Sequence, residues 1–341
     1  MRGLIVVLVL ALLQGRTSAS GAPAAPGPAP RALTIAVSGP PTAVEYLPLH
    51  LAVAAGDVRD HGLTVMLRVT PGAVQAAEAL ARGEADLAAT TLEAILRFAL
   101  RPGAPPPQLV FALTAAPPVA LLGRPGASAP SLGALAGRRV GVRAPGAPEL
   151  AWLGALLAGA GLRPTDVDVM SLGPRGVAGA LVDGAVDAAL VEEPDARRLL
   201  AAGAPLVADL RGPEAAARAL GRPTVNAGLF ARAVGGPADA TLAALGRALL
   251  AAEARLAAAP AEALARALPS AVVGLPEAFA LRVDAARALF VPGGRATPRE
   301  VAATLALVAA RRALGPAARG LRPEALVRVV PLTPPAPAPR P

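Results

Sequence analysis

The chain of 341 residues has no cysteine and no lysine. These absences exclude disulfides, thiolate zinc sites, thiol nucleophiles and Schiff-base lysines. Only two histidines occur, His50 and His61, so a histidine-rich metal site is not expected. No run of about 18 apolar residues is present, which excludes an ordinary membrane-spanning helix. We predict neither a metal nor a cofactor.

Aromatic residues and clusters of basic residues are also scarce. Only 2% of the residues are aromatic, and the 33 basic residues, all arginine, are scattered along a chain of net charge +9. Proteins that bind nucleic acid usually cluster their basic residues and interleave aromatic ones. We therefore expect no nucleic-acid partner. The hydrophobic content of 54% is too high for a disordered chain.

The first 20 residues have the order of an export signal. Arg2 precedes a short apolar run at 4–13, and the small residues at 14–20 offer a cleavage site. The apolar run is too short to span a membrane, although an uncleaved anchor is the alternative. We predict a signal peptide at 1–20, a Pro/Ala linker at 21–30 and a disordered Pro-rich tail at 331–341. The folded protein would then be periplasmic.

An internal repeat divides the remaining chain. Residues 79–88 (ALARGEADLA) and 180–189 (ALVDGAVDAA) share the pattern A-L-x-x-G-x-x-D-x-A. Each copy follows a strand-like run that ends in Pro/Gly residues, and each leads into a short apolar strand. We predict a β-α-β unit in each half, with the glycine as the helix cap. Further strands are predicted at 33–37, 109–113, 119–123, 138–142 and 225–231, and helices at 45–55, 149–158, 238–258, 261–268, 276–290 and 298–314.

These motifs resemble a known family. Besides the two repeats, the residues that carry the resemblance are 46–56, 61–65 and 131–142, and the second repeat continues into Glu192-Glu193-Pro194. In order and spacing, they are similar to the solute-binding proteins of ABC importers for sulfonates, nitrate, taurine and thiamine precursors. The resemblance implies an α/β fold of the type II periplasmic-binding-protein kind, with two Rossmann-like lobes joined by two crossing segments. We place lobe 1 at 31–118 plus 226–330 and lobe 2 at 119–225.

The resemblance implies a function as well. A small solute, expected to be anionic, would be held between the lobes by hinge closure, and an ABC permease would accept it from a monomeric protein. A receptor for a sensor or another transporter is an open alternative. An enzyme on the same fold is disfavoured, because the related enzymes use cysteine or lysine.

Ligands of open α/β sheets bind beyond the carboxyl ends of the strands. Helix N-termini there offer N–H groups and partial positive charge to an anion. Arg143 is the expected charged partner. Glu192 would instead meet an amino group or face water. Ala147 stands where the family has serine, which removes a hydroxyl contact. The predicted ligand-binding residues are Ser38, Gly39, Thr42, Tyr46, Gly72, Thr90, Thr91, Arg143, Gly146, Ala147, Glu192 and Asn226.

Several of these residues have a second, structural interpretation. Ser38, Thr42, Thr90 and Thr91 are residues that favour turns and helix caps. Tyr46 would either stack on the ligand or pack in the core.

Overall fold

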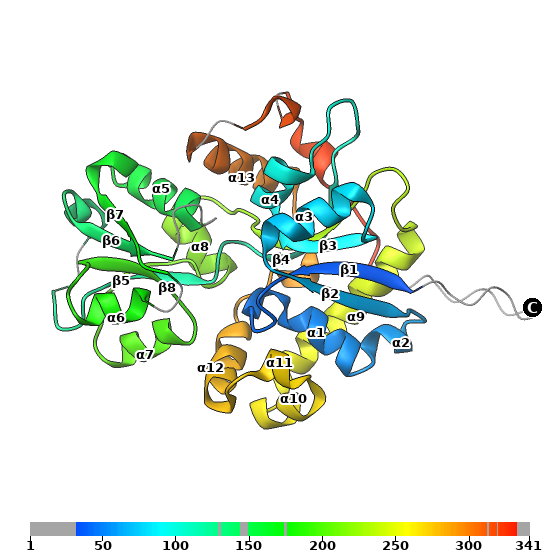
Figure 1. Cartoon of the computed structure of the whole chain (residues 1–341), viewed down its shortest axis with the longest axis horizontal. Coiled ribbons are helices and arrows are strands. Elements are labelled where there is room, and N and C mark those ends of the chain that lie inside the picture. Colours follow the sequence, from blue (N-terminus) through cyan, green and yellow to red (C-terminus); the bar gives the residue numbers. More distant parts are fainter. Residues whose placement is uncertain are drawn as a thin grey trace, which may run out of the picture. The chain divides into compact units, whose positions relative to one another are not determined.

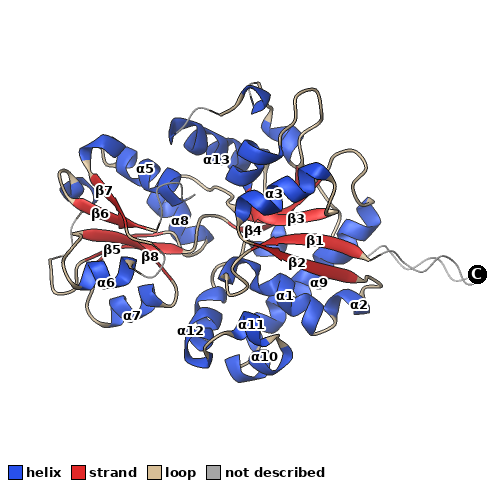
Figure 2. Ribbon diagram, in the orientation of Figure 1, coloured by secondary structure: helices blue, strands red, loops and turns tan. Residues whose placement is uncertain are grey.

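The computed structural model describes residues 32–128, 131–143, 149–173, 176–311, 314–318 and 320–332. It contains two five-stranded mixed sheets with helices on both faces, so the predicted α/β class is confirmed (Figures 1 and 2). The predicted signal peptide and linker, and most of the predicted tail, lie outside the described residues.

The first sheet has the strand order β2-β1-β3-β10-β4. β1 pairs in parallel with β2 and β3, whereas β10 is antiparallel to β3 and β4. Side chains alternate between the faces, as the pleat requires, so that Ile35 and Val37 lie in one core cluster and Ala36 in another. The strands are β1 (Leu33–Ser38), β2 (Val65–Thr70), β3 (Leu87–Thr91), β4 (Gln108–Thr114) and β10 (Ala227–Ala231).

Helices cover both faces of this sheet. Leu49 of α1 and Leu245 of α9 pack on the face that carries Ile35, whereas α3 packs on the other (Figure 1). α12 ends at Ala286, before the predicted end at 290, because Phe290 pairs with Thr114 of β4. The helices are α1 (Leu47–Ala54), α2 (Asp57–Asp60), α3 (Ala73–Arg82), α4 (Leu92–Ala94), α9 (Asp239–Ala258), α10 (Ala261–Ala267), α11 (Ser270–Val273), α12 (Pro276–Ala286) and α13 (Pro298–Arg311).

The second sheet repeats this design, with the order β7-β6-β8-β5-β9. Trp152 of α5 is buried on one face, and Leu181 of α6 on the other. Leu307 and Val308 of α13 join the cluster around Trp152. The elements are β5 (Val119–Gly123), β6 (Arg139–Val142), β7 (Asp168–Ser171), β8 (Ala188–Glu192), β9 (Leu206–Asp209), α5 (Glu149–Gly159), α6 (Val177–Val182), α7 (Asp195–Ala201) and α8 (Pro213–Leu220).

The sequence repeat corresponds to a structural repeat. Gly83 ends α3 and Gly184 follows α6, both with φ above +70°, a conformation that glycine adopts without steric cost. Asp86, just before β3, accepts a hydrogen bond from the backbone N–H of Thr34 in β1 (2.9 Å). Asp187, just before β8, accepts the equivalent bond from Arg139 in β6 (3.0 Å). The shared Gly-x-x-Asp spacing thus ties each central strand to its neighbour.

Two segments connect the sheets, and they are bonded to each other. The chain leaves β4 for β5 through 115–118 and returns to β10 through 221–226. Thr224 Oγ1 donates to the carbonyl of Ala115 (2.8 Å), and the N–H of Asn226 donates to the carbonyl of Thr114 (2.8 Å). Thr304 of α13 donates to the carbonyl of Val225 (2.8 Å). The crossing is therefore a paired ribbon anchored to α13.

Candidate functional site

The candidate site lies where strands of both sheets end. Glu192 closes β8, Arg143 follows β6, and Glu45 lies in the turn after β1, in the 3-10 helix η1 (Val44–Tyr46). The three side chains are close enough that the charges of Glu192 and Arg143 alter the pKa of Glu45. Since ligands of α/β sheets bind at the carboxyl ends of strands, we take this convergence as the candidate site.

Arg143 is held by two carboxylates of its own half. Its Nη1 lies 2.9 Å from Glu192 Oε1, and its Nε lies 3.6 Å from Glu149 Oε1. Glu149 is the first residue of α5 and is only 4% exposed. Burial raises the pKa of Glu149, while the Arg143 guanidinium counteracts the increase. Arg143 therefore already has a counter-charge on two sides.

Glu45 faces these groups from the first half of the molecule. Burial, and secondarily the nearby Glu192, raise its pKa to about 7, even though its own backbone N–H and Arg143 act in the opposite direction. No arginine among the described residues forms an ion pair with Glu45. A carboxyl group held among other carboxyl groups favours its protonated form or a cation.

Thr90 and Thr91, two of the predicted ligand-binding residues of the first half, form hydrogen bonds to backbone groups of that half. Thr90 Oγ1 donates to the carbonyl of Ala73 (3.0 Å), and Thr91 Oγ1 accepts from the N–H of Ala94 (3.2 Å), which caps α4. The Asn226 side chain donates to Thr114 Oγ1 (3.3 Å), at the crossing segments. These bonds hold the loops in place, and contact with a ligand stays a prediction for each residue.

The residues after β1 form a tightly packed turn. Tyr46 is 3% exposed within the core cluster, and its hydroxyl bonds to the side chain of Ser38. A Cβ on Gly39 would lie 2.4 Å from the carbonyl oxygen of Thr70, so only glycine fits there. The carbonyl of Thr42 accepts from Arg282 Nη1 (2.7 Å). This packing orients Glu45, which precedes Tyr46.

The other predicted residues lie in two loops. Gly72 is half-buried and precedes α3, where its carbonyl accepts from Thr70 Oγ1 (2.9 Å). Gly146 and Ala147 belong to residues 144–148, which lie outside the described residues. The structure thus brings Arg143 and Glu192 together, and their contact with a ligand stays a prediction.

Two acidic residues of the site were missed from the sequence. Glu45 precedes the predicted Tyr46, and Glu149 ends the loop that contains the predicted Gly146 and Ala147. Both therefore stood in loops already expected to contact a ligand. Their negative charge could have identified them, because two more carboxylates in these loops do not suit a site for an anion.

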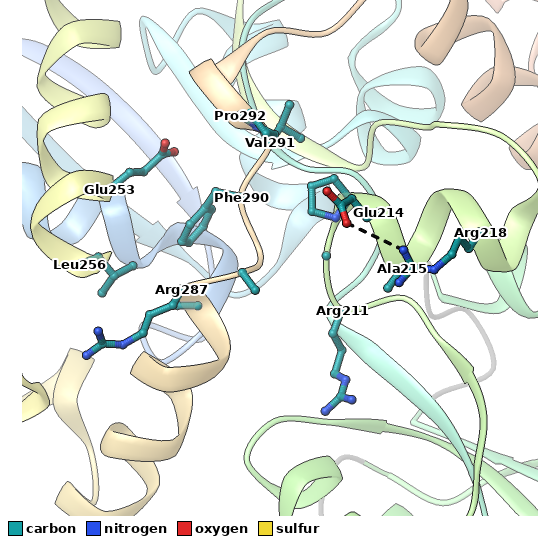
Figure 3. Close-up of a pocket in the computed structure, with 14 residues that line it drawn as sticks. Arg211, Glu214, Ala215, Arg218, Glu253, Leu256, Arg287, Phe290, Val291 and Pro292 are labelled. Carbon is teal, nitrogen blue, oxygen red and sulfur yellow. Dashed lines mark ion pairs between the residues drawn. The ribbon is translucent and has the colours of Figure 1, made fainter. Parts of the chain in front are cut away.

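A cavity of about 550 Å³ lies apart from these residues. Figure 3 shows Glu253, Leu256 and Arg287 on one wall and Glu214 with Arg218 on the other. Burial raises the pKa of Glu253 to about 8. None of the predicted ligand-binding residues lines this cavity.

Comparison with known proteins agrees with this architecture. Residues 44–208 match the family model described as NMT1/THI5 like. That segment is therefore similar to proteins of the NMT1/THI5-like family. The resemblance inferred from the sequence motifs is thereby confirmed. No match was found among curated proteins.

Solved structures share the two-lobed fold. A protein from Bordetella bronchiseptica RB50 is 26% identical, with a TM-score of 0.65, over 87% of this chain and 94% of that chain. The alkanesulfonate-binding protein SsuA from Xanthomonas axonopodis pv. citri, bound to MOPS, is 22% identical, with a TM-score of 0.63, over 89% and 100% of the two chains. The periplasmic aliphatic sulphonate binding protein SsuA from Escherichia coli is 19% identical, with a TM-score of 0.65, over 88% and 92%.

One related structure is an enzyme. The desulfurization enzyme DSZB is 17% identical, with a TM-score of 0.53, over 88% of this chain and 95% of that chain. In the part of the chain that the structure describes, no three His, Asp or Glu residues are grouped as a metal site would require. Nor does any described helix have the length and apolar character to cross a membrane.

Proposed function

We propose that the protein is the periplasmic solute-binding component of an ABC importer and that it captures a small organic solute between its two sheets. The observation that carries the proposal is the convergence of Glu45, from the first half, with Arg143 and Glu192, from the second. Ligands in such folds bind where strand ends converge. The sulfonate-binding relatives support this type of function.

The crossing segments supply the means of closure. Because the described chain crosses between the sheets at 115–118 and 221–226, rotation at these segments would open or close the site. A solute that contacts both halves stabilises the closed form through its higher affinity for that form. The closed form would then be recognised by a permease in the membrane, with one protein molecule delivering one solute.

If the predicted export signal is functional, solute binding takes place outside the cytoplasm. Cleavage near residue 20 would release a monomer into the periplasm. Catalysis is disfavoured because the chain lacks the cysteine and lysine on which the related enzymes depend.

The solute class predicted from the sequence spans sulfonates, taurine, nitrate and thiamine precursors. A thermal-shift panel of these compounds and of organic amines, on the exported form of the protein, tests the binding function directly. A ligand at about 100 times its Kd should add roughly 2.7 kcal/mol to the free energy of unfolding.

Small-angle X-ray scattering with and without the strongest ligand tests closure. We expect the radius of gyration to fall on binding. If several compounds of the panel raise the melting temperature without any compaction, binding stands and hinge closure is refuted. If no small solute binds at millimolar concentration, the proposed function is wrong.

A further inference from the structure

Negative charge exceeds positive charge at the candidate site. Glu45, Glu149 and Glu192 surround the single guanidinium of Arg143. The Arg143 contacts of 2.9 Å to Glu192 and 3.6 Å to Glu149 account for one positive charge shared between two carboxylates. Glu45 has no such partner among the described residues. When all four groups are ionised, the site holds two more negative charges than positive ones.

Two of the helix starts near this site, those of α4 and α5, carry an acidic residue, whereas the first turn of α3 has none. Glu149 is the first residue of α5, and Glu93 lies in the first turn of α4. Glu93 is paired with Arg97, whose Nε lies 2.9 Å from Glu93 Oε1. Acidic side chains there already interact with the partial positive charge of the helix ends. An entering anion would compete with these carboxylates and would also be repelled by Glu45.

We propose that the solute carries a cationic group with N–H donors, an ammonium, amidinium or guanidinium, and that this group lies between Glu45 and Glu192. The inference rests on the proposed function, because it names the solute of that same site. Carboxylates from both halves of the molecule would then be bridged by one cation. Charge-assisted hydrogen bonds of this type are short and about twice as strong as neutral ones.

The ionisation of Glu45 agrees with this arrangement. Burial and the neighbouring Glu192 hold its pKa at about 7, so an adjacent cation would favour the ionised form. A group without N–H donors, such as a quaternary ammonium, would need aromatic rings instead. The tyrosine of this region, Tyr46, is buried in the core and does not provide one.

The test compares three benzene derivatives of similar size and different charge: benzamidinium, its planar neutral isostere benzamide, and the anion benzenesulfonate. Titration calorimetry on the exported form measures each affinity at pH 7.5. We expect benzamidinium to bind at least ten times more tightly than the other two. Both E45Q and E192Q should weaken benzamidinium at least tenfold, and R143Q should strengthen it.

Matched controls separate charge at the site from charge in general. E262Q removes the same charge on the exposed surface of α10 and should change no affinity by more than twofold. A melting curve for each variant verifies folding. E192Q is the second variant if E45Q fails to fold, because the Glu192 side chain is 49% exposed.

The relative affinities of the three ligands distinguish a cationic from an anionic solute. Preferred binding of benzenesulfonate, lost in R143Q, would overturn the charge inference and leave the solute-binding function standing. Equal binding of benzamide and benzamidinium would do the same. If none of the three ligands binds, nor any solute of the wider thermal-shift panel, the proposed function fails together with the inference.

Discussion

The two halves of the molecule share a scaffold and differ in the chemistry at their strand ends. Asp86 and Asp187 make the same backbone hydrogen bond in each half, 2.9 Å to Thr34 N and 3.0 Å to Arg139 N. Beyond this common frame, the first half presents hydroxyl and amide groups that bond to nearby backbone or to Thr114. The second half presents Arg143 and two glutamates.

This difference distinguishes residues that stabilise the fold from residues that could determine which solute binds. In the first half, Thr90, Thr91 and Asn226 stabilise loops and the crossing segments. Glu93 is paired with Arg97, and Glu45 forms no ion pair among the described residues. In the second half, ionic groups converge at the ends of β6 and β8. We infer that the shared repeat determines where a solute binds, and that the charged residues determine which solute binds.

The largest expected effect is on the contact between the halves at Gly212. This residue has φ of +137°, and a Cβ there would lie 2.6 Å from the carbonyl oxygen of Ala288. G212A should lower the free energy of unfolding by roughly 2–4 kcal/mol, through backbone strain and overpacking together. Chemical denaturation measures the change.

A matched control for this prediction is G179A in α6. A Cβ at Gly179 meets no atom within 4 Å. Helical alanine is favoured over glycine, so stability should stay constant or rise by about 0.5–1 kcal/mol. Equal losses in the two variants would show that Gly212 has no special contact.

The next largest effect tests the repeat itself. D86A and D187A each remove the acceptor of a backbone N–H in a central strand. Each should cost about 1–3 kcal/mol of unfolding free energy, because a partly buried donor loses its partner, and D187A also removes the ion pair with the Arg139 side chain. Denaturation of both variants checks whether the losses are similar. A loss confined to one half would contradict the structural equivalence of the two aspartates.

A pH effect is expected from the raised carboxyl pKa values. Burial raises the pKa of Glu253 to about 8 and of Glu45 to about 7, so these groups bind more protons in the folded state than in the unfolded state between about pH 4.5 and 8. The free energy of unfolding should therefore fall between about pH 6.5 and 8. Below that window His50 opposes the trend, because burial lowers its pKa to about 4.

Melting temperatures of the wild type and E253Q at several pH values test this effect. E253Q should remove most of the decline above pH 7, whereas E262Q should leave it intact. A wild-type melting temperature that rises over this window would disprove the assignment.

The smallest expected effect is on Thr91, and it separates a structural role of this first-half residue from a role in ligand binding. Thr91 caps α4 through the N–H of Ala94, so T91A should cost about 1 kcal/mol of unfolding free energy. If Thr91 serves only as a cap, ligand affinity will not change by more than twofold in calorimetry. A tenfold loss of affinity would instead identify Thr91 as a ligand contact, as the sequence predicts.

Much of the architecture was predictable from the chain itself. The Gly-x-x-Asp repeat predicted two β-α-β units because its glycine suits a helix cap and its aspartate leads into an apolar strand, and the structure adds that this aspartate bonds to the neighbouring strand. The strand at 119–123 and the return strand at 225–231 were predicted, and the structure places them as β5 and β10 (Ala227–Ala231) in the two sheets. Local patterns thus predicted the elements and the two β-α-β units, whereas the strand order of each sheet comes from the structure.

The charge of the site was harder to predict. Arg143 and the helix N-termini suggested an anion. The pairing of Arg143 with Glu192 and Glu149 was not predictable, because it depends on the meeting of β6, β8 and α5. Glu45 comes from another strand end, nearly 100 residues earlier in the chain. Such a convergence is a property of the fold, and no local pattern reports it.

The most direct test of the account is the pH dependence of benzamidinium affinity. The groups that act on Glu45 are Glu192, Glu149, Arg143 and the buried Tyr46. With its pKa near 7, Glu45 ionises between pH 6 and 8 while benzamidinium stays charged. We expect up to about tenfold tighter binding at pH 8 than at pH 6 in the wild type, and a much weaker dependence in E45Q. An affinity that stays constant or falls with rising pH, or an equal slope in E45Q, would contradict the claim that Glu45 binds a cation.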